Sequence, residues 1–70
     1  MEEFKEVLRK NTQFGTTEIW WKRGIGDYIR YGIWREDNGT LNSGYCCWLF
    51  KGPVLGWFSS FNEAKEKING

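Results

Sequence analysis

The chain has 70 residues, of which ten are basic and nine acidic, so its formal net charge is +1. A charge this close to zero excludes a strong long-range field that would attract nucleic acid, acidic substrates or anionic lipid. A chain of this length buries only about 60% of the surface it exposes when unfolded, so its thirteen aromatic residues (five Trp, three Tyr, five Phe) must supply much of its stability. We expect one domain over residues 1–70.

The first predicted element is a short helix over residues 2–11. Phe4, Val7 and Leu8 follow the i, i+3, i+4 spacing of an apolar helix stripe among charged residues, and Asn11 is a typical helix stop. The amino terminus lacks the positive start and apolar run of a secretory signal, and no stretch approaches the roughly 18 apolar residues of a membrane span. We therefore expect a cytoplasmic protein that does not bind a membrane.

After this helix the hydrophobic period changes to two, and the residues become β-branched and aromatic, which is typical of strands. The candidate strands are residues 17–23, 27–35, 44–51 and 54–58. The Asp-Asn-Gly-Thr sequence at residues 37–40 predicts a type I′ hairpin, and Gly-Ile-Gly-Asp at residues 24–27 predicts another tight turn. Because the links are short, we expect an antiparallel meander of three to four strands.

The last predicted element is a helix that begins at Ser60. Ser60 and Glu63 form an S-x-x-E capping pair, and Phe61, Ala64 and Ile68 then repeat at helical spacing. The predicted fold class is therefore α+β, a small antiparallel β-meander flanked by an N-terminal and a C-terminal helix that pack on the sheet.

The segment Leu-Gly-Trp-Phe-Ser-Ser-Phe-Asn-Glu-Ala-Lys at residues 55–65 resembles the strand-to-helix junction of the AP2 and integrase amino-terminal DNA-binding domains. The resemblance implies a three-stranded sheet packed on one helix, with a basic, arginine-rich sheet that reads DNA. Residues 12–58 depart from that pattern, because five basic side chains there stand against four acidic ones. We therefore do not assign the chain to that family.

The residue types that most catalysis requires are absent or isolated. There is no histidine, which removes the commonest general base and metal ligand. The two cysteines, Cys46 and Cys47, are adjacent, so their side chains point to opposite faces of a strand and are interpreted as reduced, buried hydrophobes. We predict a non-enzymatic protein with no catalytic residue, no cofactor and no metal site.

Both faces of the predicted sheet are rich in apolar residues, and two short helices are too small to cover both. We expect an exposed patch made of Tyr28, Arg30, Trp34, Trp48 and Phe50. Trp20 with Lys22 would form a second contact near the sheet edge if the Trp20 indole is exposed. The alternatives are that one helix covers each face, so that the aromatic residues are simply core, and that a loop covers Trp20.

The first functional hypothesis is a small binding protein that docks its aromatic sheet face on a protein partner as an inhibitor, adaptor or regulator. Trp, Tyr and Arg are the residues that interface hot spots favour. In size and style such a chain resembles the compact proteins that phages and other mobile elements encode.

The alternative is a nucleic-acid-binding module in which bases stack on the same rings. Its phosphate-binding residues would be Lys22, Arg23, Arg30, Arg35 and Lys51. Self-association through the patch is a third reading.

Overall fold

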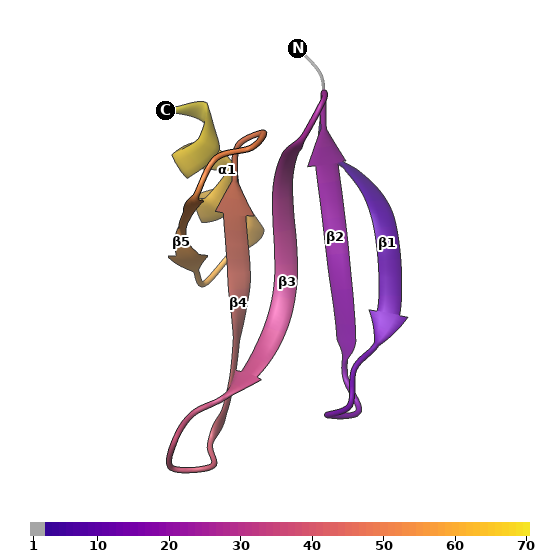
Figure 1. The fold of residues 1–70 in the computed structure, drawn as a ribbon, viewed down its shortest axis with the longest axis vertical. Coiled ribbons are helices and arrows are strands. Elements are labelled where there is room, and N and C mark those ends of the chain that lie inside the picture. Colours follow the sequence, from indigo (N-terminus) through magenta and orange to yellow (C-terminus); the bar gives the residue numbers. More distant parts are fainter. Residues whose placement is uncertain (1–2) are drawn as a thin grey trace.

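Five antiparallel strands and one helix make up residues 3–70, the part of the chain that this computed structural model describes. The elements are β1 (Lys5–Asn11), β2 (Thr17–Arg23), β3 (Asp27–Arg35), β4 (Leu41–Trp48), β5 (Val54–Phe58) and α1 (Phe61–Asn69). The strands lie side by side in sequence order, so each pairs with its neighbour in the chain (Figure 1). The α+β meander is confirmed, with five strands instead of three to four and one helix instead of two.

The predicted N-terminal helix is wrong, because residues 5–11 form the edge strand β1, paired with β2. The register shifts between Glu6 and Leu8, which places Val7 in a β-bulge. A bulge moves the following residues to the other face, so residues three apart share a side, as the Glu6–Arg9 ion pair at 2.7 Å shows. A bulged strand therefore imitates helical spacing. The first residue of the predicted helix, Glu2, lies outside the described residues.

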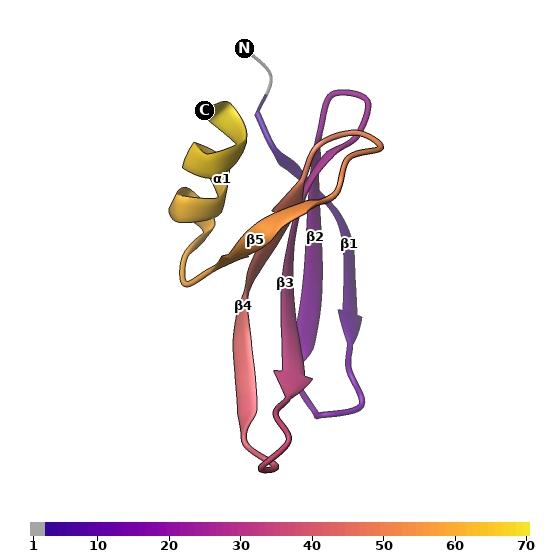
Figure 2. The same ribbon diagram turned by 60° about the vertical axis from the view of Figure 1, so that its left-hand side comes forward.

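The C-terminal helix is confirmed, and it covers one face of the sheet over β3, β4 and β5 (Figure 2). Ser60 is the N-cap, and its hydroxyl oxygen accepts a hydrogen bond from the Glu63 backbone N–H at 3.2 Å. The Glu63 carboxylate accepts from the backbone N–H and the hydroxyl of Ser59. The predicted capping pair thus fixes the start of α1, with its return bond made one residue earlier than in the usual capping box.

The hydrophobic core lies between α1 and the sheet and is small. Ile29, Cys47 and Ala64 are fully buried there. The partly buried residues packed around them are Phe4, Trp21, Tyr45, Leu55, Phe58, Phe61 and Ile68. All of these lie on the helix side of the sheet, so the opposite sheet face has no covering element among the described residues.

The β3–β4 hairpin lies where the sequence predicted it, but its turn differs from the expected type I′. The Glu36 carbonyl accepts from the Gly39 N–H at 2.9 Å, and only Gly39 in this loop has a positive φ, +87°. These features describe a type I turn followed by a left-handed glycine. β4 therefore starts at Leu41 and ends at Trp48, instead of spanning residues 44–51.

The β2–β3 loop packs against the β4–β5 turn through Gly26 and Phe50. A Cβ on Gly26 would stand 2.4 Å from Cδ2 of the Phe50 ring, closer than atoms can approach. We expect Gly26→Ala to lower the free energy of unfolding by about 1 kcal/mol, at the low end for overpacking, because the partly exposed ring can swing away.

Urea denaturation measures this cost, and a double-mutant cycle locates it. In a Phe50→Ala background the ring is absent, so Gly26→Ala should cost much less there. An equal cost in both backgrounds would show that the ring contact is not its source.

Candidate functional site

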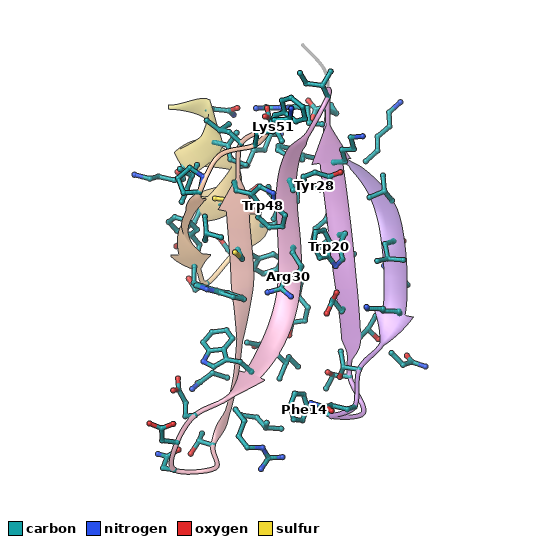
Figure 3. All side chains as sticks on the ribbon, in the orientation of Figure 1. Phe14, Trp20, Tyr28, Arg30, Trp48 and Lys51 are labelled. Atoms are coloured by element: carbon teal, nitrogen blue, oxygen red, sulfur yellow. The ribbon has the colours of Figure 1, made fainter. Side chains whose placement is uncertain are left out.

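The sheet face opposite α1, called the open face below, combines aromatic and basic side chains from all five strands. Cross-strand pairing and strand alternation place on it Lys5, Leu8 and Lys10 of β1, Glu18, Trp20 and Lys22 of β2, Tyr28, Arg30, Gly32 and Trp34 of β3, Asn42, Gly44, Cys46 and Trp48 of β4, and Val54 and Trp57 of β5. Figure 3 looks onto this face, where Trp20, Tyr28, Arg30 and Trp48 lie close together on β2, β3 and β4.

Three partly exposed rings form the centre of the open face. Tyr28 and Trp48 face each other across β3 and β4 and stack, with ring centroids 5.3 Å apart and an interplanar angle of 24°. Trp20 meets both edge-on, at 5.8 Å from Tyr28 and 5.3 Å from Trp48. Since each ring comes from a different strand, their mutual packing holds the cluster in place and leaves it as a preformed aromatic surface.

Arg30 links this cluster to a second pair of rings. Its guanidinium lies 5.6 Å from the Trp20 ring centroid and 5.4 Å from that of Trp57, within cation–π range of both. Trp57 packs on Trp34 with ring centroids 4.6 Å apart. Both indoles lie over Gly44, whose lack of a side chain leaves the room that they occupy.

Two carboxylates hold indole N–H groups on this face. Trp20 donates from Nε1 to Glu18, and Trp34 donates from Nε1 to Glu36 at 2.9 Å. Glu36 also accepts from the Asn42 amide at 2.9 Å. Glu18 instead lies near two cations, 3.8 Å from Nη1 of Arg30 and 3.9 Å from Nζ of Lys10. The two acids therefore have similar roles toward tryptophan and different electrostatic surroundings.

The two faces of the sheet differ in charge, although the net charge of the whole chain is only +1. On the strands, the open face carries four bases against one acid: Lys5, Lys10, Lys22 and Arg30 against Glu18. The helix side is balanced, with Arg9, Arg23, Arg35, Lys65 and Lys67 against Glu3, Glu6, Asp27, Glu63 and Glu66. Glu36 and Asp37 lie at the β3–β4 hairpin, and Lys51 at the opposite end of the sheet (Figure 3). Lys5, Lys22 and Lys51 thus gather at the end away from that hairpin, where the one carboxylate among residues 3–70 that lines the same hollow as Lys5 and Lys22, that of Glu3, is paired with Lys65.

Lys5 and Lys22 lie directly opposite each other across β1 and β2. Like charges in this position are destabilising, by roughly 0.2–1 kcal/mol. Among residues 3–70 neither ammonium group forms an ion pair with a carboxylate. An anion bound between them would relieve a repulsion that the folded chain leaves in place.

The predicted partner-binding residues fall mostly on one surface. Tyr28, Arg30, Trp34 and Trp48 all lie on the open face, as their alternation indicated. Phe50 does not share their strand, because β4 ends at Trp48 and Phe50 belongs to the following turn. It remains close to the same end of the sheet, where its ring packs on Gly26.

The predicted phosphate-binding residues divide between the two faces. Lys22 and Arg30 lie on the open face, and Lys51 lies in the β4–β5 turn with Nζ 5.3 Å from the Phe50 ring centroid. Arg23 is on the helix side, where it pairs with Asp27 at 3.3 Å and donates to the Asn69 side chain at 2.7 Å. Arg35 also points away from the open face, with its guanidinium 5.5 Å from the Phe14 ring centroid.

Sequence reasoning missed four residues of the open face, Lys5, Lys10, Glu18 and Trp57, and understated Trp20. Lys5 and Lys10 were hidden by the helix predicted over their segment. Trp57 was not named as a candidate, although it lies in the predicted strand over residues 54–58, where alternation could have assigned it to a face. Trp20 was treated as a separate edge contact, whereas its ring completes the central cluster.

Both cysteines are free and buried, and they lie on opposite faces of β4. Burial raises the pKa of the Cys46 thiol, although nearby Arg30 acts in the other direction, and burial likewise raises the pKa of Cys47. Their thiols therefore stay protonated and pack as small hydrophobes. Within the described part of the chain, no group of three or more His, Cys, Asp or Glu side chains is placed to hold a metal ion.

Comparisons with protein-family models, with curated proteins and with solved structures gave no match for this chain. No helix among residues 3–70 has the length and apolar character needed to cross a membrane. Any functional assignment therefore depends on the geometry and charge of the open face.

Proposed function

We propose that the protein binds single-stranded nucleic acid on its open face without catalysing a reaction on it. The observation that supports this function is the sorting of charge, which brings four cations and five Trp and Tyr rings onto one face. Proteins that bind single strands combine the same two elements, basic groups for the phosphates and aromatic rings on which bases stack.

Three of the four cations lie on one side of the rings, and the fourth, Arg30, lies between the rings of Trp20 and Trp57. Lys5, Lys10 and Lys22 belong to β1 and β2, whereas the rings extend from Trp20 on β2 to Trp57 on β5. A single strand would run along the β1–β2 side with its phosphates on the lysines and its bases turned toward the rings. Because every base has a π-face, such binding tolerates different sequences.

A protein partner is the second candidate, and a separate observation favours it. Several large apolar side chains are exposed at the end of the sheet that bears the β2–β3 loop and the β4–β5 turn. They are Ile25 (77% exposed), Leu49, Phe50 and Val54. Nucleic acid does not require them, whereas a protein interface with Trp, Tyr and Arg anchors would use them. In that case the protein would act as an inhibitor, adaptor or regulator.

Titration of fluorescent single-stranded DNA and RNA oligonucleotides tests the proposed function. Four cations that each neutralise one phosphate would lower the affinity about 50-fold as salt rises from roughly 50 to 200 mM, given a slope of about −0.7 per contact. Trp48→Ala should weaken binding by roughly 1–3 kcal/mol, because it removes a stacking ring. Arg35→Ala, a control on the helix side, should change it little.

Two results would contradict the proposal: affinity that is insensitive to salt, or affinity that Trp48→Ala leaves intact. In that event, capture of a protein by the wild type but not by Trp48→Ala would support the second candidate. A concentration-dependent increase in mass, also lost in Trp48→Ala, would instead indicate self-association.

A further inference from the structure

Three donors from three different strands converge on the Glu18 carboxylate. They are the indole N–H of Trp20, Nη1 of Arg30 at 3.8 Å and Nζ of Lys10 at 3.9 Å. The Glu18 side chain is only 16% exposed, so its charge lies within this group rather than out in solvent. It is also the one acid that the described strands place on an otherwise basic face.

The two cations hold this carboxylate loosely. Charge-assisted hydrogen bonds from Arg or Lys to a carboxylate are typically about 2.7–2.9 Å long, well below the separations found here. Lys10 and Arg30 therefore keep N–H donors available for another anion. A guanidinium, an ammonium and an indole N–H around one point suit the oxygen atoms of a phosphate group.

We propose that Lys10, Arg30 and the Trp20 indole N–H form a phosphate subsite, and that the Glu18 carboxylate occupies it until a phosphate displaces it. This inference rests on the proposed function and extends it, because it assigns one phosphate of the bound strand to a named position. The internal carboxylate keeps the three donors oriented in the free protein. It also competes with the ligand, so it lowers the affinity for phosphate.

Glu36 provides a matched control within the same sheet. It accepts the indole N–H of Trp34 much as Glu18 accepts that of Trp20, but among residues 3–70 no cation forms an ion pair with it. Replacement of either glutamate by glutamine removes one negative charge and retains an oxygen that accepts the indole hydrogen bond. Only Glu18→Gln removes the competing anion from the subsite.

The test is a titration of inorganic triphosphate into ¹⁵N-labelled protein, followed through the indole N–H resonances. In the wild type the Trp20 resonance should shift most. Glu18→Gln should bind triphosphate at least about five-fold more tightly, the factor for removing one unit repulsion at 4 Å in water. Glu36→Gln should stay within about two-fold of wild type, since its charge is not in the subsite. The dispersion of the spectra reports that each variant is folded.

Equal effects of the two substitutions, or a Trp20 resonance that does not move, would overturn the subsite. Titration of the same variants with oligonucleotides separates this inference from the proposed function. If triphosphate behaves as expected but no oligonucleotide binds, the function is wrong and the subsite stands. If oligonucleotides bind equally well to Glu18→Gln and Glu36→Gln, the function stands and the subsite is wrong.

Discussion

Reversal of one charge at the Lys5–Lys22 pair should make the protein more stable and a weaker binder at the same time. In Lys5→Glu the repulsion across β1 and β2 becomes an attraction, so the free energy of unfolding should rise by roughly 0.5–1 kcal/mol. The same change removes one phosphate contact and pairs Lys22, so we expect at least a tenfold loss of oligonucleotide affinity at low salt.

Urea denaturation and fluorescence titration measure the two quantities. The plot of log affinity against log salt should also become shallower by about 1.4, since two single-strand contacts are lost. Lys67→Glu is the matched control for binding, because it changes the net charge equally on the helix side; it lies in the last turn of α1, so the stability of this variant should fall. A destabilised Lys5→Glu would contradict the repulsion between the two lysines, and one that binds like wild type would contradict their contact with phosphate.

A chain that ends at Phe58 should lose cooperative unfolding. It lacks α1, so Ile29 and Cys47 lose the cover of Ala64, Phe61 and Ile68. Full burial of a large apolar side chain contributes roughly 1.5–3 kcal/mol, and the partly buried Phe61 and Ile68 each contribute a share of that in a domain that rarely has more than about 3–5 kcal/mol in total. Loss of both side chains, together with the fully buried Ala64, therefore removes a large part of the stability.

Near-UV circular dichroism during heating reports whether the aromatic side chains are fixed. The truncated chain should show no sharp transition. The full-length Ser60→Ala variant, which loses only the N-cap hydrogen bond, should keep a sharp transition at a cost on the order of 1 kcal/mol. Full cooperative melting of the truncated chain would refute the dependence of the sheet on α1.

Most of the strand pattern could be predicted because it depends on local signals. The ends of β2, β3 and β5 agree with the predicted ranges, since turn or cap residues mark them: glycine-containing turns before each strand and the Ser60 helix cap after β5. β1 could not be predicted in this way. The bulge at Val7 breaks its alternation, and the tertiary pairing with β2 that stabilises it leaves no local signal.

The candidate site was predictable in part for the same reason. Alternation correctly gathered Tyr28, Arg30, Trp34 and Trp48, but it could not decide which apolar face α1 covers. Charge counts along the sequence ignore alternation, so Arg23 and Arg35 were grouped with cations that lie on the other face. The basic character of the open face becomes visible only when β1 is placed in the sheet.

The extra residue in β1 has a consequence for the evolution of this surface. Lys5 and Lys10 are five positions apart, an odd number, so in a regular strand their side chains would point to opposite faces. The bulge at Val7 supplies the one-residue offset that brings both onto the open face and still leaves Phe4 packed against Phe61 on the helix side, with ring centroids 6.0 Å apart. Loss of Val7 alone would exchange the faces of Phe4 and Lys5, so within residues 4–10 we expect a deletion to be tolerated less well than a substitution.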